Sequence, residues 1–499
     1  MGYVEGIDRD QIMMVSYDDL VEGDSMVRLI DRFVEVTDLA KMGFTHTATA
    51  PTGRPPYDPS SMTKLHLYGY QNDARSSRKL ERETYRNVEV MWLMDGLKPD
   101  HKTIAEFRRK NIRPLQKLFH EFVRLCKSWD LVGGELIAVD GTKIKASNNK
   151  KMNFSRKKLD ARLARIDEQI LEYLNQMEEA DVQEERNLDS APMKLQKLLE
   201  RKDLYESYKA QLDSNGENEV SAVDPDARLM GNNRGGVEMA YNVQSAVDGK
   251  NDLILEYDVS MNPSDQDQLG KMVKKVKRRL KVQRFTVLAD KGYYNGRDLL
   301  RVKRCKVKAI VSRQNPSDPK DQPAQFHTDK FIYDSNTDTY TCPNGKILQP
   351  HSKKTADRRN FFNKAACSEC PFLSQCARGD RPYRAVARGR YSKICDETDK
   401  RTRENIVLYK RRQQIVEHPF GTIKFTMRGN YFLLRTRRKV CTEVALLFLS
   451  YNLKRVYTIL GFHEIMARLD SLPAHFLAFI MKTAHILECS ALTAPIEFG

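Results

Sequence analysis

The 499-residue sequence lacks the segments that would send a protein into or across a membrane. Its first ten residues, MGYVEGIDRD, do not have the basic-then-apolar layout of a secretory signal. The most apolar stretches, Val444–Leu453 and His475–Ile486, are too short and too interrupted to span a bilayer. We therefore expect a cytoplasmic protein with no membrane partner, whose nine cysteines are thiols or metal ligands and not disulfides.

Several catalytic motifs are also missing. None of the ten histidines forms an HExxH pair, and the segment GNNRGG near Gly231 does not have the GxxxxGK[ST] spacing of a phosphate-binding loop. Aromatic motifs of the kind that stack on RNA bases are absent, which argues against an RNA-directed protein. The sequence therefore gives no support to a zinc peptidase or a nucleotide hydrolase.

Acidic residues are the minority charge. There are 84 lysines and arginines against 67 acids, which gives a net charge of +17 and a pI near 9.3. Two stretches, Lys271–Arg284 and Lys424–Arg455, have eight basic residues each, and only Glu443 opposes them. A basic excess of this kind indicates nucleic acid first and anionic membrane second. No lipid-anchor pattern accompanies it, so nucleic acid is the predicted partner.

The N-terminal part, residues 1–129, is helical in pattern and is predicted to bind DNA. Three short amphipathic segments follow one another in it: SSRKLERETYR, VEVMWLMDGL and TIAEFRRKN. Thr103 and Glu106 predict a capping box at the start of the third segment, which also contains Arg108 and Arg109. Three short helices with a basic last one are typical of a helix-turn-helix. An ordinary helical bundle with a solvated basic face is the alternative.

The remaining pattern is that of an α/β protein with insertions. Strands and helices follow in the order strand, strand, strand, helix, strand, helix, strand, which predicts a mixed sheet that begins as a meander. Two helical seams predict a helical hairpin inserted after the first strand. The predicted parts are a catalytic core of residues 130–154, 214–313 and 404–460, the helical hairpin 155–213, a cysteine-rich insertion 314–403 and a helical C-terminal tail 461–499.

Three acids stand where a catalytic site could form. Asp140, in LIAVDGTKIKA, lies near the junction of two apparent strand segments, although Asp-Gly is also common turn chemistry. Asp290 ends the buried strand of FTVLADKGYY, and Glu417 follows the apolar stripe of a helix that Pro419 should kink. Converging carboxylates repel unless cations neutralise them, and oxygen ligands suit Mg²⁺. Two such ions would clamp the attacking and leaving oxygens of a phosphoryl displacement.

These stretches resemble the DDE transposases of bacterial insertion sequences. The resemblance rests on IAVDGTKIKA, VLADKGYYNG, IVEHPFGTIK and the N-terminal PDHKTIAEFR, and it covers nearly the whole chain. It implies a ribonuclease-H-like catalytic core behind a helical N-terminal domain. It also implies an enzyme that binds the terminal inverted repeats of its element, cuts there with Mg²⁺ or Mn²⁺, and joins the freed 3′ ends to target DNA. Members of this family usually act as at least a homodimer on double-stranded DNA.

The resemblance also gives roles to individual residues. It makes Asp140, Asp290 and Glu417 the catalytic metal ligands, with Glu404 as a lower-ranked rival for the third acid.

Family members often have Tyr, two residues, Arg, three residues, Glu, six residues and Lys around that third acid. Lys424 fits the pattern and would contact a phosphate near the scissile bond. Tyr409 and Arg412 keep their mutual spacing and would contact DNA, but four residues separate Arg412 from Glu417.

The cysteine-rich insertion predicts a structural zinc site. CSECPFLSQC and an upstream CPNG supply four candidate ligands: Cys342, Cys367, Cys370 and Cys376. Cys395 and His351 are substitutes in the ligand set, and four reduced thiols in a loop-rich segment are the alternative.

Two further functions compete with transposition. One is a repurposed, catalytically inactive DNA-binding protein, and the other is a nuclease of the same fold that cuts DNA but never joins ends. Loss of activity on replacing Asp140 would exclude the first, and strand joining would exclude the second.

Overall fold

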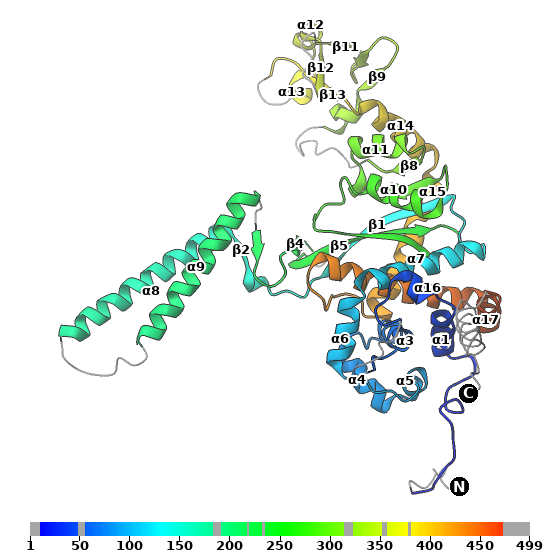
Figure 1. Ribbon diagram of the computed structural model, residues 1–499. Coiled ribbons are helices and arrows are strands. Elements are labelled where there is room, and N and C mark those ends of the chain that lie inside the picture. The colour runs from blue at the N-terminus through cyan, green and yellow to red at the C-terminus, as the bar shows by residue number, and fades with distance from the viewer. Residues whose placement is uncertain are drawn as a thin grey trace, which may run out of the picture.

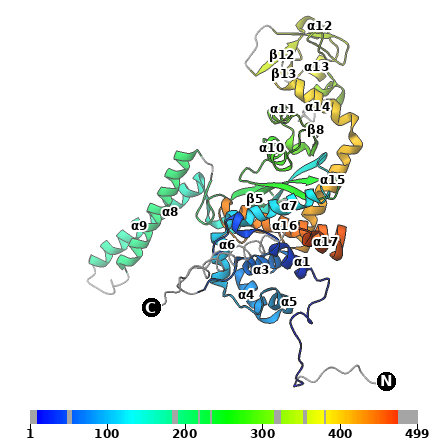
Figure 2. The same ribbon diagram turned by 45° about the vertical axis from the view of Figure 1, so that its right-hand side comes forward.

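The computed structural model describes residues 10–47, 55–182, 191–216, 219–231, 235–313, 323–351, 357–377 and 381–472. A mixed β-sheet with helices on both faces lies at its centre, above a cluster of N-terminal helices (Figure 1). A helical hairpin projects to one side, and a small second sheet lies at the far end (Figure 1, Figure 2). The predicted fold class, a ribonuclease-H-like mixed α/β core with a helical N-terminus, is confirmed.

The N-terminal region is helical, as predicted. Its helices are α1 (Met26–Glu35), α2 (Leu39–Met42), α3 (Pro59–Gln71), α4 (Ser77–Arg86), α5 (Val88–Leu93), α6 (His101–Lys110) and α7 (Ile112–Ser128). The three short segments of the predicted helix-turn-helix are α4, α5 and α6.

The predicted capping box at the start of α6 is wrong. Asp100 caps this helix by accepting hydrogen bonds from the backbone N–H groups of Lys102 (2.8 Å) and Thr103 (2.9 Å). Glu106 forms an ion pair with Arg109 instead. Asp is as good an N-cap as Ser or Thr, and Asp100 directly precedes the helix, whereas Thr103 is already within its first turn.

The central sheet has six strands. They are β1 (Leu136–Lys145), β4 (Arg228–Gly231), β5 (Val237–Asp248), β6 (Ile254–Ser260), β7 (Thr286–Ala289) and β8 (Lys308–Val311). β5 pairs antiparallel with β1, β4 and β6, whereas β7 is parallel to both β1 and β8. The antiparallel neighbours β1, β5 and β6 form the expected meander, and β7 and β8 then join the sheet as parallel strands.

Strand β1 differs from its prediction. The sequence suggested two strand segments meeting near Asp140, but β1 continues from Leu136 to Lys145 and pairs with β5 from Ile137 onward. Only the pairing with β7 stops early, at the Val139–Ala289 pair. Asp140 therefore marks the end of the parallel pairing and lies inside the antiparallel one, so the Asp-Gly turn does not occur.

Helices cover the sheet on both sides (Figure 1). Helices α10 (Leu269–Leu280) and α11 (Gly296–Arg304) lie above it in that view, and α7 and α16 (Arg437–Leu460) lie below. Helix α14 (Ser392–Glu404) packs on β8, and α15 (Ile406–Gly421) runs past β1, β5 and β7. The π-helical segment η5 (Thr422–Thr426) links α15 to α16, and α17 (Phe462–Asp470) follows. Among the described residues, no helix has the length and apolarity needed to cross a membrane.

The predicted helical hairpin consists of α8 (Arg156–Val182) and α9 (Ala191–Asn215). Short strands β2 (Asn153–Ser155) and β3 (Glu219–Ser221) pair at its base. The apolar seam between the two helices forms a core of its own, separate from the main one, with Phe154, Leu159, Ile166, Tyr205, Leu212 and Val220 buried in it. The hairpin is therefore held by its own packing and by the strand pair.

The cysteine-rich insertion is a second, five-stranded sheet. Its strands are β9 (Ile332–Asp334), β10 (Thr339–Thr341), β11 (Ile347–Pro350), β12 (Arg358–Phe362) and β13 (Val386–Gly389). Two short helices, α12 (Lys364–Ser368) and α13 (Leu373–Cys376), lie between β12 and β13. The insertion has a small core of five buried side chains: Phe331, Tyr340, Leu348, Phe361 and Val386. The C-terminal tail beyond residue 472, with Cys489, lies outside the described residues.

Candidate functional site

The first two predicted acids lie side by side. Val139 of β1 pairs with Ala289 of β7 in parallel register, and Asp140 and Asp290 are the next residues on the two strands. Asp290 leaves the strand at once, because its Oδ1 accepts the N–H of Gly292 at 2.6 Å and caps the 3₁₀ turn η2 (Lys291–Tyr293). The register of the parallel pair thus brings two carboxylates to one end of the sheet.

A third carboxylate, Asp265, lies beside this pair and was not predicted. Its Oδ1 accepts hydrogen bonds from the side-chain amides of Asn242 and Gln244, both at 2.8 Å. The space above Gly141 is filled by Asp265 and the amide of Gln244, since a Cβ added there would meet Gln244 Nε2 first and would stand 2.6 Å from Asp265 Oδ1. Helix α10 begins at Leu269, so Asp265 lies in the loop before it.

The surroundings of Asp140 favour its neutral form. Burial raises the pKa of Asp140 to about 7, and the negative charges of Asp290 and Asp265 add to that rise. The guanidinium of Arg412 and the N–H of Gly141 act in the opposite direction. Directly across the ladder from Asp140, Ser245 has a buried hydroxyl with no hydrogen-bond partner among the described residues. Asp140 is therefore a carboxylate whose charge needs a cation beside it.

Two of the predicted DNA contacts face this carboxylate. Arg412 of α15 is the largest cationic influence on Asp140, and its Cζ lies 5.9 Å from the ring centroid of Tyr409. Lys424, in η5, is partly buried, which lowers the pKa of its amine, while the charge of Asp140 raises it. Tyr409 and Arg412 thus lie together as their spacing suggested, on the helix that packs against β1.

The predicted third acid, Glu417, lies on α15 and is exposed. Its Oε1 accepts a hydrogen bond from Gln413 at 2.7 Å, and it is not among the charges with the largest influence on Asp140. The rival Glu404 ends α14, is exposed, and lies 3.9 Å from Lys400. Pro419 lies inside α15, two residues before regular α-helical bonding gives way to η5.

The two arginines proposed for the DNA-reading helix have different environments. Arg108 is 6% exposed and donates to Tyr70 Oη and to the carbonyl of Arg75, both at 3.3 Å. Its guanidinium lies inside the protein, so the prediction that Arg108 contacts DNA is not supported by its position. Arg109 points to solvent and pairs only with Glu106 among the described residues.

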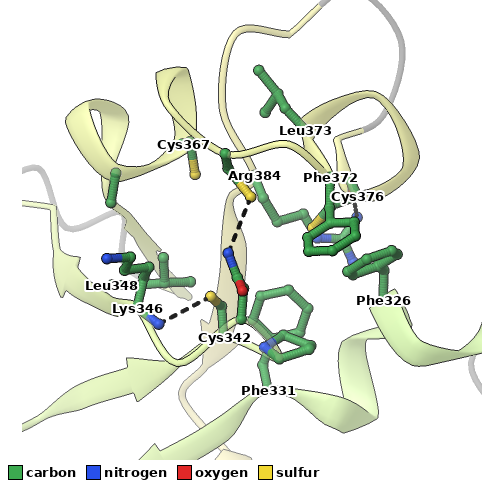
Figure 3. A pocket seen from close by; sticks show the side chains of 14 residues that line it. Phe326, Phe331, Cys342, Lys346, Leu348, Cys367, Phe372, Leu373, Cys376 and Arg384 are labelled. Carbon is green, nitrogen blue, oxygen red and sulfur yellow. Dashed lines mark hydrogen bonds between the residues drawn. The ribbon is translucent and has the colours of Figure 1, made fainter.

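The four predicted zinc ligands surround one pocket of the small sheet (Figure 3). Burial raises the pKa of the Cys376 thiol to about 11, and the other three cysteines add to that rise. Cys395 and His351, the predicted substitutes, do not line this pocket. Among the described residues, no three potential ligands converge on a common point, either here or at the carboxylates.

Known protein families match two parts of the chain. Residues 15–110 match the family described as "Transposase domain (DUF772)", and residues 182–453, more than half the chain, match "Transposase DDE domain". The second match includes Asp290, Glu417 and Lys424, whereas Asp140 precedes it. No curated protein matches.

One solved structure is similar in outline, the cryo-EM structure of the piggyBac transposase synaptic complex with hairpin DNA. The two sequences are 7% identical, and the match covers 95% of this chain and 86% of the piggyBac transposase chain, with a TM-score of 0.31. A likeness this low supports no argument about the site.

Proposed function

The chain belongs to the DDE transposase family, and from this membership we propose that it binds the terminal inverted repeats of its insertion sequence, cleaves there and joins the 3′ ends to target DNA. It is a DNA transposase, with DNA as its partner. The finer steps of repeat recognition, cleavage and joining are our proposal.

The observation that best supports cleavage is the pair Asp140 and Asp290 with basic side chains opposite. The register of β1 and β7 fixes the two acids next to each other, and Arg412 and Lys424 act on Asp140 from α15 and η5. A DNA phosphate has the negative charge that these two cations would hold. The scissile phosphate would then lie between the cations and the carboxylates.

DDE transposases generally use divalent metals, and the residues here fit such an ion. Asp140 and Asp290 supply oxygen ligands, which Mg²⁺ and Mn²⁺ prefer. Asp140 has like-charged neighbours, and the Ser245 hydroxyl beside it has no hydrogen-bond partner in the described part of the chain, so a cation would balance this cluster. Bound metal ions would activate the attacking oxygen and stabilise the leaving one.

Two residues are candidates for the third carboxylate. Glu417 has the support of the family pattern, because six residues separate it from Lys424. Asp265 has the support of position, because it lies next to Asp290 and Gly141 and is one of the charges that raise the pKa of Asp140. We propose Glu417 as the ligand and Asp265 as a second acid that holds Asn242 and Gln244 in place.

The remaining contacts follow from position, since Arg412 and Lys424 act on Asp140 and Arg109 is exposed on α6. We propose that Tyr409, Arg412 and Lys424 contact the DNA backbone at the cleavage site, and that Arg109 contacts DNA from α6. Because transposition joins two ends to one target, we propose a homodimer on the paired ends.

The test uses duplex DNA with the inverted repeats that flank the gene, purified full-length protein, and Mg²⁺ or Mn²⁺. Strand cleavage and joining are resolved on denaturing gels for wild type, Asp140→Asn, Asp290→Asn, Glu417→Gln and Asp265→Asn. Glu404→Gln is the matched control, since it removes an exposed acid near the same helix.

We expect cleaved and joined products from wild type and Glu404→Gln, and none from Asp140→Asn, Asp290→Asn or Glu417→Gln. Binding without cleavage would favour a repurposed binding protein, and cleavage without joining a nuclease of the same fold. Activity in Glu417→Gln but not in Asp265→Asn would transfer the third ligand to Asp265.

A further inference from the structure

The four cysteines of the small sheet come from two stretches of the insertion, CPNG and CSECPFLSQC. Cys342 follows β10, Cys367 lies in α12, Cys370 lies between the two short helices, and Cys376 ends α13. All four line one cavity of about 30 Å³, and Figure 3 shows the sulfur atoms of Cys342, Cys367 and Cys376 around it. A cavity of that volume holds a single small ion or one water.

Hydrogen-bond donors already point at two of the sulfurs. The CPNG turn closes with Gly345 at φ +73° and its N–H bonded to the carbonyl of Cys342 at 2.8 Å. This turn brings the N–H of Lys346 to 3.3 Å from Cys342 Sγ. The amide of Asn344 donates to Cys370 Sγ at 3.6 Å, so the turn reaches across the cavity (Figure 3). Donors aimed at sulfur stabilise thiolates and orient them as ligands.

A fixed positive charge stands beside the cluster. Arg384 donates to the carbonyl of Cys376 at 3.2 Å and to Thr328 Oγ1 at 3.1 Å, and its Cζ lies 5.4 Å from the Phe331 ring centroid. Four thiolates with one divalent cation retain a net negative charge, which a guanidinium held by three contacts would partly balance. The cluster therefore has the charge arrangement of a metal–thiolate centre.

The insertion also needs a crosslink. Its core has five buried side chains for a sheet of five short strands, which is little apolar area for a unit of this length. The four cysteines are only partly buried, and two of them, Cys342 and Cys376, pack against this core from its edge. Metal ions stabilise small units of this kind when their own core is insufficient.

We propose that Cys342, Cys367, Cys370 and Cys376 bind one structural Zn²⁺ ion. Four thiolates from separate segments are a tetrahedral zinc set. Among the described residues these sulfurs surround the cavity without converging on one point, so we infer that zinc binding completes the fold of the two short helices over the CPNG turn.

This ion would act on the helices that lead to the cleavage site. Strand β13 continues directly into α14, where Gly389 donates to Ser392 Oγ at 3.0 Å and Arg388 pairs with Asp396 at 2.6 Å. Helix α14 leads into α15, which contains Arg412. The zinc site would therefore fix the start of a helix pair whose far end faces Asp140.

The experiment measures metal in the full-length protein, purified without chelators, by inductively coupled plasma mass spectrometry. We expect about one zinc per chain in wild type, loss of most of it in Cys342→Ser and Cys370→Ser, and wild-type content in the control Cys305→Ser. Fluorescence of Trp92 and Trp129, both in the N-terminal region, shows whether the rest of each variant is folded.

A second measurement needs no variant. Wild type loaded with Co²⁺ should show thiolate-to-cobalt charge-transfer absorption, and a mercurial thiol reagent should release the bound zinc in proportion to the thiols that it blocks. Wild type that lacks zinc and also gives no thiolate–cobalt absorption would overturn the proposal. Equal zinc in Cys342→Ser and Cys305→Ser would do so as well, and iron in place of zinc would reject the assigned metal. Each readout is independent of DNA cleavage.

Discussion

Replacing Arg108 with alanine should destabilise the protein, whereas the same change at Arg109 should not, although the two are neighbours in α6. Arg108 lies in a buried network with Tyr70, Arg75 and Glu443. The Glu443 carboxylate, wholly buried in α16, accepts the N–H groups of the loop before that helix, at 3.0 Å from Leu433 and 2.7 Å from Leu434. The network therefore joins the N-terminal helices to the catalytic core.

The size of the effect follows from the unpaired charge. Arg108 acts on Glu443 through its charge, while its hydrogen bonds go to Tyr70 and Arg75. Removing one of two opposite buried charges costs up to about 3–5 kcal/mol, because the other charge stays desolvated. Arg75 remains near Glu443 and donates to the carbonyls of Tyr431 and Arg428, so we take the lower end, about 3 kcal/mol. Arg109 has an exposed pair with Glu106, three residues away on the same helix, which contributes about 0.3–0.5 kcal/mol.

The assay is thermal unfolding followed by tryptophan fluorescence, since both tryptophans lie in the N-terminal region. For a unit of 150–250 residues the predicted loss in Arg108→Ala corresponds to a fall in Tm of about 6–12 °C. Arg109→Ala should have the same Tm as wild type. If Arg109 contacts a phosphate, the slope of log affinity for DNA against log salt should fall by about 0.9 in that variant.

The reverse pattern would refute this reasoning. If Arg108→Ala melted like wild type and lost DNA affinity, Arg108 would be a surface contact and the buried network would not exist in solution. The double variant Arg108→Met, Glu443→Gln removes both charges and should recover part of the lost stability. No recovery would assign the loss to packing instead of to the unpaired carboxylate.

Three further predictions concern other parts of the chain. Gly141→Ala places a Cβ 2.6 Å from Asp265 Oδ1, so it should abolish cleavage and lower stability by about 1–3 kcal/mol. The control Gly231→Ala, whose added Cβ meets nothing within 4 Å, should do neither in the same gel and melting assays. Burial lowers the pKa of His66 to about 3 from an ordinary 6.5, so the stability due to its neutral form is present above pH 6.5 and is lost as pH falls. Between pH 7.5 and 5.5 that loss is about 1.4 kcal/mol, and urea titrations of wild type should show it while those of His66→Gln should not. Leu159→Ala should destabilise the separate hairpin core by about 2–4 kcal/mol, seen as an earlier loss of helical circular dichroism with an unchanged tryptophan transition; a shift of both signals together would contradict its independence.

Strand and helix order was predictable because it depends on local pattern. The apolar runs before Asp140 and Asp290 identify β1 and β7, and the hairpin seam appears as three- and four-residue steps. What a local pattern does not contain is the partner of each strand. The local pattern therefore suggested that two strand segments meet at Asp140. In the structure β1 continues through Asp140, and only its parallel neighbour β7 ends there.

The candidate site was predictable in part for the same reason. Asp265 lies in the polar stretch NPSDQDQ, which has no periodicity. Its place beside Asp290 depends on hydrogen bonds that it accepts from Asn242 and Gln244 of β5. Sequence reasoning also treated Arg108 and Arg109 alike, since composition does not distinguish a buried guanidinium from an exposed one. A signal for Asp265 did exist: a glycine inside a strand, here Gly141 directly after Asp140, indicates a close approach of another group.

The geometry of the sheet explains why these acids meet where they do. Asp140 and Ser245 share one face of the β1–β5 ladder, and Gly141 and Gln244 share the other, because neighbours in a strand alternate. Acids from opposite faces cannot normally meet through a sheet. Here β7 leaves β1 after Ala289, so the sheet has an open edge beside Asp140, into which the turn at Asp290 folds. Gly141, without a side chain, lets Asp265 approach that edge from its own face. The early end of the β1–β7 pairing thus leaves the open edge at which Asp140, Asp290 and Asp265 gather.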